Sequence, residues 1–526
     1  FVSLARPQRP SSFKTMSMTM RPSSLIRGLA PSATVLAVVA CDPTDSFAPP
    51  AAKQGPQSLA QSNLVCGDTV DLDPRRSLAV TDQAILKPFT FTRVMQQIVT
   101  TSKAPGLTPT LLYQRWWDFF NQTPGLRPEA PHCDDHFAAG QPALGAFPIT
   151  CPRPEGVLAG TDPFSAPDTN PDAYVPIGLF NRFDLAPLDG STCGEYRIIF
   201  AKRSGIDDPA DRNLIIFEAA LPNPKPQCGV DGCRAVAEFW AENSAIADPN
   251  VLRDRLEQFY FVDAAGAGPV VHAEHYGPRS GQIRTNSFMS GPNIWQLHEF
   301  TFDPDCGFGA CIRPTTLKDN PFAELFQDPA PWTGTQWFHT WFVRQVANLE
   351  LADSNMFFMR DVGTFKAGAS TSDGDFDNYR QQSGFASPFR DAVQAAITKP
   401  GVTADNIFNR ALALSCSGCH EHANKLENAD LGGGIGWQPS LGFVHVTEEF
   451  TEPGPFGPRF PISDGLDLLF LPHRKQVLED FLAQATCDPC TDKKIKQFGK
   501  PSPEKFLPPG FTDPEGLTLG GPRSGH

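Results

Sequence analysis

Four runs of strand-forming residues, with helical segments between and after them, constrain the fold of this chain most strongly. Each run is rich in β-branched and aromatic side chains, as β-strands are. Apolar residues recur at three-to-four spacing over 234–242, 251–259 and 337–351, which predicts helices. Strands and helices do not alternate as regular βαβ units, so the sequence predicts an α+β fold. The four predicted strands are Glu195–Lys202, Asn213–Ala220, Gln282–Ser287 and Trp295–Phe302.

The chain is long enough for more than one domain, and its composition changes along its length. It has 526 residues with 52 prolines and 43 glycines, which predicts long irregular connections. We expect an α+β domain with disulfides over 64–390. Helical patterns dominate after about Pro388, so a small all-α domain is expected over 391–498. The Pro/Gly-rich segment 499–526 is interpreted as a loose tail.

An export signal is predicted near the N-terminus. Arg21 and Arg27 precede an apolar stretch, Leu29–Ala40, which is too short to span a bilayer but has the length of a signal-peptide core. The residues upstream of this pattern are interpreted as an extension from an incorrectly chosen start. Residues 1–40 are therefore expected to be removed.

The residues that end the apolar stretch, Val38-Val39-Ala40-Cys41, resemble the lipobox of bacterial lipoproteins. The resemblance implies that Cys41 is acylated and anchors the protein to a membrane by its lipid alone. The Pro-, Ala-, Gln- and Ser-rich segment 41–63 would then be a flexible tether. The implied location is the envelope of a Gram-negative bacterium, on the periplasmic side or the outer-membrane face. An ordinary secretory signal that contains a cysteine is the alternative.

The charge of the chain argues against nucleic acid as a partner. The formal net charge is −14, and loss of the five positive charges in residues 1–40, which contain no acid, leaves −19. Such a surface repels phosphate backbones and anionic headgroups. It suits a basic partner protein.

One pentapeptide carries recognisable chemistry. Cys416-Ser417-Gly418-Cys419-His420 has the form C-x-x-C-H. Two thiols three residues apart can reach two vinyl groups on one porphyrin edge, and the adjacent histidine can then coordinate the iron. The motif resembles the attachment site of c-type cytochromes. The resemblance implies one covalent haem c, held by Cys416 and Cys419, with His420 as the proximal ligand.

The surroundings of the motif also resemble a cytochrome c domain. Thr403 is a candidate N-cap for an amphipathic helix that leads to the motif. A Gly-rich loop, 431–434, follows, and then a closing helix that contains Val477 and Phe481. Two alternatives for the cysteines are a plain disulfide and a thioredoxin-like dithiol, although the dithiol needs a strand before the motif and a helix after it.

The sequence offers several candidates for the distal ligand of the implied haem. No methionine follows Met359, whereas a downstream methionine is the usual distal ligand in cytochrome c. His445 is the first candidate for the sixth position on the iron, because it lies in a loop after the motif. His473 is the alternative, because it lies on the apolar face of the closing helix. Met356, Met359 or an open position are the remaining choices.

The cysteine count agrees with an oxidising compartment. Of 13 cysteines, one assigned to lipid and two to haem leave ten, which is enough for five disulfides. Sequence spacing predicts the pairs Cys66–Cys193, Cys133–Cys151, Cys228–Cys233, Cys306–Cys311 and Cys487–Cys490.

These features together predict an envelope-anchored monohaem electron carrier that serves a redox partner protein. One alternative is a haem-free, disulfide-stapled binding lipoprotein, and another is a haem oxidoreductase with an open iron site. The sequence contains no nucleophile elbow, P-loop or dinucleotide fingerprint, so it names no catalytic residue for an enzyme.

Overall fold

The structure, a computed structural model, describes residues 70–483 apart from 119–136, 139–140, 145–146, 149–153, 188, 278–279, 289–294, 308, 319, 332, 361–364, 372–377 and 426–428. Helices and an antiparallel sheet are both present, as the α+β prediction requires. The helices are α1 Pro74–Ser77, α2 Gln83–Leu86, α3 Phe91–Ser102, α4 Pro109–Trp117, α5 Arg234–Glu242, α6 Pro249–Phe261, α7 Thr333–Val343, α8 Val346–Leu349, α9 Tyr379–Gln382, α10 Pro388–Ala396, α11 Ala404–Ala413, α12 Cys416–His420 and α13 Leu471–Leu482. The strands are β1 Ala79–Val80, β2 Phe137–Ala138, β3 Gln141–Leu144, β4 Phe147–Pro148, β5 Tyr174–Arg182, β6 Thr192–Lys202, β7 Asn213–Pro222, β8 Gln282–Phe288, β9 Trp295–Asp303, β10 Cys311–Thr315, β11 Ser370–Thr371, β12 Glu452–Gly454 and β13 Gly457–Arg459.

The main sheet has eight strands in the order β1-β5-β6-β7-β8-β9-β10, with β11 also paired to β9, and its pairs are antiparallel. Its register aligns one apolar residue from each of five neighbouring strands in a single row. All five are buried, because this face packs against helices. The row is Leu179, Ile198, Phe217, Ile283 and Phe300.

The four predicted strands are confirmed as β6 to β9, but the strands that flank them, β5 and β10, were not predicted. The longer of the two, β5, contains Pro176 and Gly178, and both residues normally weaken a strand. A register shift between these two residues forms a bulge that accommodates them against β6. The local sequence of β5 therefore does not favour a strand, and pairing with the neighbouring strands stabilises it.

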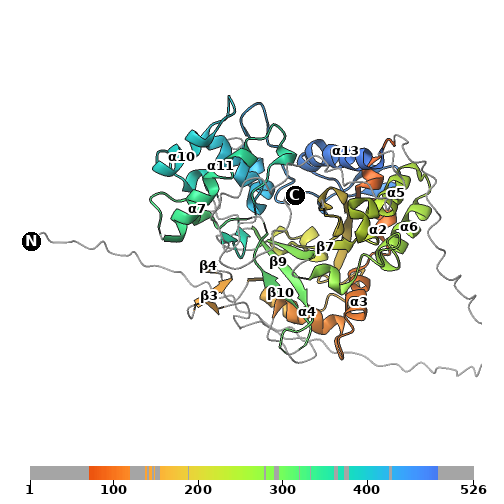
Figure 1. The fold of residues 1–526 in the computed structure, drawn as a ribbon. Helices are drawn as coiled ribbons and strands as arrows, with labels where there is room; N and C mark the ends of the chain where they lie inside the picture. The colour runs from red at the N-terminus through yellow and green to blue at the C-terminus, as the bar shows by residue number, and fades with distance from the viewer. Residues whose placement is uncertain are drawn as a thin grey trace, which may run out of the picture. The chain divides into compact units, whose positions relative to one another are not determined.

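Two large hydrophobic cores support the sheet and the helices. The first core contains the apolar row of the sheet, the helices α3 to α6, and α13. The second contains α7 to α11, with Phe326, Phe342 and Phe408 packed against one another. In Figure 1, α3 and α4 lie on one side of β7 and β9, and α11 and α13 lie on the other.

A separate all-α C-terminal domain is not confirmed. The described residues belong to one contact unit. α11 packs with α7 and α9, which precede the expected boundary, whereas α13 packs in the first core with the sheet. The single helix expected over 337–351 is divided into α7 and α8.

The disulfides partly correct the predicted pairing. Cys306–Cys311 is present, but Cys193 is bonded to Cys233, so the predictions Cys66–Cys193 and Cys228–Cys233 are wrong. Cys228 is itself disulfide-bonded. The physical reason lies in Asn223, whose side-chain nitrogen donates to the carbonyls of Gly190 and Gly229, each at 2.7 Å. This bridge packs the start of β6 on the turn Pro226–Cys233, which brings Cys193 to Cys233.

Several predictions fall outside the described residues. They are the signal segment 1–40, the lipidation site Cys41, the tether 41–63, the cysteines Cys66, Cys133, Cys151, Cys487 and Cys490, and the tail 499–526. Within the described ranges, no helix has both the length and the apolar character needed to cross a bilayer.

Candidate functional site

The helix α11 delivers the C-x-x-C-H motif to its place. Thr403 caps its start: the Thr403 hydroxyl accepts from the Asn406 amide, and the Asn406 side chain accepts from the Thr403 amide at 2.9 Å. Ile407, Phe408 and Leu412 bury one face of the helix in the second core. The predicted cap is confirmed, and it sets where the helix begins.

The motif itself forms the short helix α12. The Ser415 hydroxyl caps it, accepting from the Gly418 amide at 3.0 Å and donating to the Leu412 carbonyl at 2.7 Å. A Cβ at Gly418 would lie 1.6 Å from the Leu412 oxygen, so only glycine fits there. Outside the motif, the side chain of Asn320 accepts from the Cys416 amide at 2.9 Å. The turn is therefore locked between α11 and the loop before α7.

His420 is oriented by a backbone carbonyl. Its Nδ1 lies 2.7 Å from the Phe443 carbonyl oxygen, which can only accept, so Nδ1 carries the hydrogen. The Nε2 atom therefore keeps its lone pair, as a metal-binding imidazole requires. The pKa of His420 is lowered to about 4, mainly by burial; the bond to the Phe443 carbonyl opposes this effect and the positive charge of Arg284 adds to it. The ring is neutral at neutral pH, and it stacks on Trp295 with centroids 5.5 Å apart.

His445 approaches the same motif from a separate loop. Its Nε2 lies 3.0 Å from the Cys419 sulfur, and its Nδ1 lies 2.7 Å from the Ser463 hydroxyl. The centroids of the His420 and His445 rings are 4.8 Å apart, at an interplanar angle of 59°. The His445 ring thus lies close both to the His420 ring and to the Cys419 thiol, although it is 25 residues from His420 in the chain.

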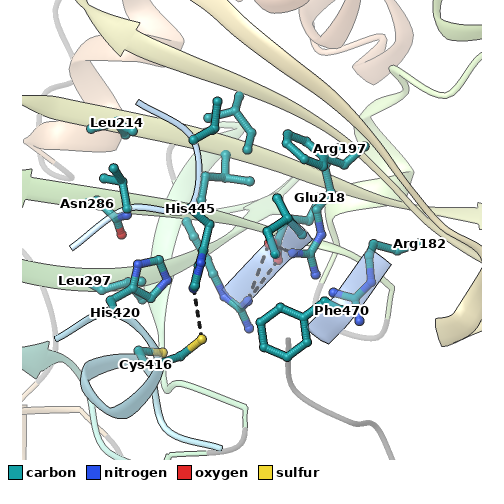
Figure 2. Close-up of a pocket in the computed structure, with 18 of the residues that line it drawn as sticks. Arg182, Arg197, Leu214, Glu218, Asn286, Leu297, Cys416, His420, His445 and Phe470 are labelled. Carbon is teal, nitrogen blue, oxygen red and sulfur yellow. Dashed lines mark hydrogen bonds and ion pairs between the residues drawn. The ribbon is translucent and has the colours of Figure 1, made fainter. Parts of the chain in front are cut away.

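These side chains close one end of a large pocket under the second face of the main sheet. The empty space in this pocket is about 970 Å³, which includes open solvent at its mouth. Alternate residues of five neighbouring strands line it, which follows from the period of two in a strand. Figure 2 shows the imidazoles and sulfur atoms on one side and Arg182, Arg197 and Glu218 on the other. The strand residues are Phe180, Arg182, Arg197, Ile199, Leu214, Ile216, Glu218, Arg284, Asn286 and Leu297.

The pocket wall is strongly cationic. Arg182, Arg197, Arg284, Arg474 and Lys318 line it, against the single carboxylate of Glu218. Arg197 and Arg284 both reach Glu218, at 3.1 and 3.4 Å. The pKa of Arg284 is raised, because Glu218 and Glu299 outweigh the opposing effect of burial. Burial and the charge of Arg182 hold the pKa of Arg474 well below its usual value.

The two thiols of the motif differ from reactive cysteines. Both are reduced in the structure. Burial, together with the neighbouring Cys416, raises the pKa of the Cys419 thiol to about 12. A reactive dithiol instead needs a depressed thiol pKa. The predicted order of a helix before the motif is confirmed, which also disfavours a thioredoxin-like arrangement.

The structure brings together four of the predicted site residues, Cys416, Cys419, His420 and His445. His473 lies outside this pocket, in an adjoining cleft, with its Nδ1 3.9 Å from an oxygen of Asp353. Met356 and Met359 are not among the residues that line the pocket. The pocket arginines were not predicted. Arg197 in β6 and Arg284 in β8 each alternate with apolar neighbours, and this alternation is the sequence signal that could have indicated them.

The pocket residues fit the haem that the sequence predicts. Neither motif thiol is in a disulfide, and the Nε2 of His420 retains a lone pair. The side chain of Arg182 is buried and lines the pocket, and its Nη1 has no hydrogen-bond partner among the described residues. A carboxylate would satisfy such an atom.

The fold and site together define an α+β protein in which a C-x-x-C-H turn and a second histidine close a cationic pocket beneath an antiparallel sheet. No protein-family model, curated protein or solved structure matches this chain.

Proposed function

We propose that this protein is a monohaem c-type cytochrome that transfers electrons. One observation carries the proposal: His420, with its Nδ1 bound to the Phe443 carbonyl, faces His445 beside the reduced thiols of Cys416 and Cys419. A haem, when bound, supplies one-electron chemistry at its iron. The chain's own residues attach it, orient it and exclude water from it.

Each residue of the motif has a separate role in this proposal. The Cys416 and Cys419 thiols would hold the haem covalently, each through a thioether to one of its two former vinyl groups. His420 would bind the iron through Nε2, because the carbonyl of Phe443 occupies Nδ1. His445 is the second imidazole, and its bond to the Ser463 hydroxyl turns its Nε2 toward the motif. The cytochrome c-like domain expected over 391–498 would then share its haem pocket with the sheet.

Covalent haem attachment can be tested with the full chain produced alongside haem-attachment machinery. We expect a haem stain that survives denaturation and a pyridine haemochrome spectrum of thioether-linked haem. The double variant Cys416→Ala/Cys419→Ala should lose both signals. The matched control Cys306→Ala/Cys311→Ala removes another close cysteine pair, one held in a disulfide, and should keep them. A colourless wild-type protein with unmodified sulfurs at 416 and 419 would overturn the proposal.

A cysteine–histidine enzyme is the second candidate, and one observation favours it. The contacts Cys419 to His445 and His445 to Ser463, at 3.0 and 2.7 Å, have the order of a nucleophile, a base and an orienting group. Its weakness is the raised pKa of Cys419, since a nucleophile needs a thiolate. It also leaves His420 and Cys416 without a role.

The proposed location is the bacterial envelope, with Cys41 as the lipid anchor and 41–63 as the tether. The net charge of −14 supports a basic protein as the redox partner rather than a nucleic acid. A haem-free, disulfide-stapled binding lipoprotein and a haem oxidoreductase with an open iron site stay as alternatives. The ligation experiment in the Discussion separates the carrier from the oxidoreductase.

A further inference from the structure

Two buried arginines lie on the wall of the pocket, and one of them, Arg182, has a guanidinium nitrogen without an acceptor among the described residues. Arg182 is 1% exposed and Arg474 is 6% exposed, and both line the pocket. Arg182 comes from the end of β5, and Arg474 comes from α13. Asp184 binds the Nε and Nη2 of Arg182 at 2.9 and 2.8 Å. Asp184 lines the neighbouring cleft, which Arg182 and Arg474 border as well as the pocket.

The third guanidinium nitrogen of Arg182 is the atom that points to a ligand. Its Nη1 is buried, and within the described part of the chain nothing accepts its hydrogens. A buried donor without an acceptor is costly and rare in folded proteins. Arg474 brings a second positive charge near Arg182. Burial and the charge of Arg182 together lower the pKa of Arg474. Like charges in a buried site are stabilised when an anion lies between them.

We propose that Arg182 and Arg474 form a subsite for an anionic oxygen group, a carboxylate or a small oxyanion, inside the pocket. Arginine suits this role, because its planar donors match the two oxygens of a carboxylate. The group has two sources. It belongs either to a propionate of the attached haem or to a free anion that enters the pocket. The first source rests on the proposed function, and the second does not.

The test uses sodium acetate as the probe, with sodium chloride holding the ionic strength constant. The first arm uses the full chain made without haem-attachment machinery, and its melting temperature is followed as acetate replaces chloride. We expect a saturable rise, because a ligand that binds the folded state stabilises it. Absence of an acetate-specific rise in the wild-type protein overturns the subsite.

Two variants and a control locate the binding. Arg182→Gln and Arg474→Gln should each weaken the apparent acetate affinity at least about tenfold, as expected when one partner of a buried charged contact is lost. Arg474→Gln keeps the Arg182–Asp184 pair, so it remains informative if Arg182→Gln does not fold. Arg253→Gln, on the exposed side of α6, should leave the affinity unchanged. An unchanged affinity in Arg474→Gln overturns the proposal.

The second arm repeats the titration with the haem-loaded protein and distinguishes the sources. If acetate stabilises only the haem-free protein, a haem propionate occupies the subsite. If it stabilises both forms, the subsite takes a free anion. Both results support an anion subsite at Arg182 and Arg474. A chain that never acquires haem fails the proposed function, yet the first arm still decides the subsite.

Discussion

The Nδ1 of His420 is held at 2.7 Å by the carbonyl of Phe443, a residue whose backbone is left-handed with φ 74°. A bulky residue in this conformation costs about 1–3 kcal/mol, so its neighbours must maintain it. Trp295 stacks on both rings, with centroids 5.5 Å from His420 and 5.9 Å from Phe443. The orientation of His420 is therefore set by a strained loop and a strand, and not by the motif alone.

The first prediction concerns the second axial ligand. In the haem-loaded protein, His445→Ala should convert a low-spin iron to high spin and open it to carbon monoxide, because the facing imidazole is lost. His473→Ala is the matched control and should change neither property, since His473 lies beside Asp353 outside the pocket. Absorption spectra with and without carbon monoxide measure both. A wild-type protein that is already high spin would favour the open-site oxidoreductase.

Thiol reactivity provides a second prediction. In the folded haem-free protein at about pH 8, iodoacetamide should modify Cys419 roughly a thousandfold more slowly than an ordinary exposed thiol. The reason is its pKa of about 12, which leaves almost no thiolate. Mass spectrometry of timed samples gives the rate, and urea-unfolded protein is the control in which the protection should vanish. Rapid modification of folded protein at Cys419 would instead support the cysteine–histidine enzyme.

A buried ion pair ties the His445 loop to the sheet. Glu448, 1% exposed at its side chain, binds Arg212 at 2.8 Å, whereas the neighbouring Glu449 is 39% exposed and lies 3.6 Å from the same arginine. Glu448→Gln should lower the free energy of unfolding by about 3 kcal/mol, because Arg212 keeps a buried charge. Glu449→Gln should cost less than about 1 kcal/mol. Urea unfolding measures both, and equal losses would contradict the expectation.

Stability should also depend on pH through His275, which lies in the 3-10 turn Ala273–Tyr276. Burial lowers its pKa to about 4, against the ordinary 6.5, although its Nδ1 binds the Val270 carbonyl at 2.9 Å. Between these values the unfolded state binds more protons than the folded state, so stability is lost as the pH falls. From about pH 7.5 to about pH 5, the wild-type protein should lose about 2 kcal/mol more than His275→Gln. Urea unfolding at both values tests this, and parallel losses would refute it.

The lipid anchor yields the last prediction. Cys41→Ser should move the protein from the membrane fraction to the soluble fraction, because one thiol carries the proposed attachment. Cell fractionation followed by antibody detection measures how the protein distributes between the two fractions. Mass spectrometry of the mature N-terminus is the complementary measurement. Continued membrane association with residues before 41 still present would argue for a different anchor.

Several features of the fold and of the candidate site could be predicted because their causes are local. The cap at Thr403 and the bond between Cys306 and Cys311 depend on residues three to five apart in the chain. The strands β6 to β9 follow from side-chain preferences over a few residues. The C-x-x-C-H motif is likewise a matter of spacing. Each of these interactions forms within one element or one turn.

Other features depend on which distant segments meet. β5 is a strand because β1 and β6 pair with it despite Pro176 and Gly178. Cys193 reached Cys233 because Asn223 bridges two loops. His445 and His473 had similar local support, and only the packing of the loop and α13 placed one of them in the pocket.

The sequence by itself determined the α+β character, the position of the motif and the capped helix that leads to it, because backbone propensity and capping act over a few residues. The tertiary structure alone decided that the sheet provides most of the pocket wall and that Arg182, Glu218 and Arg284 face it. A strand's alternation tells which residues share a face, but the layers packed on each side decide which face becomes the core and which becomes a site. That choice depends on burial and charge summed over the whole chain.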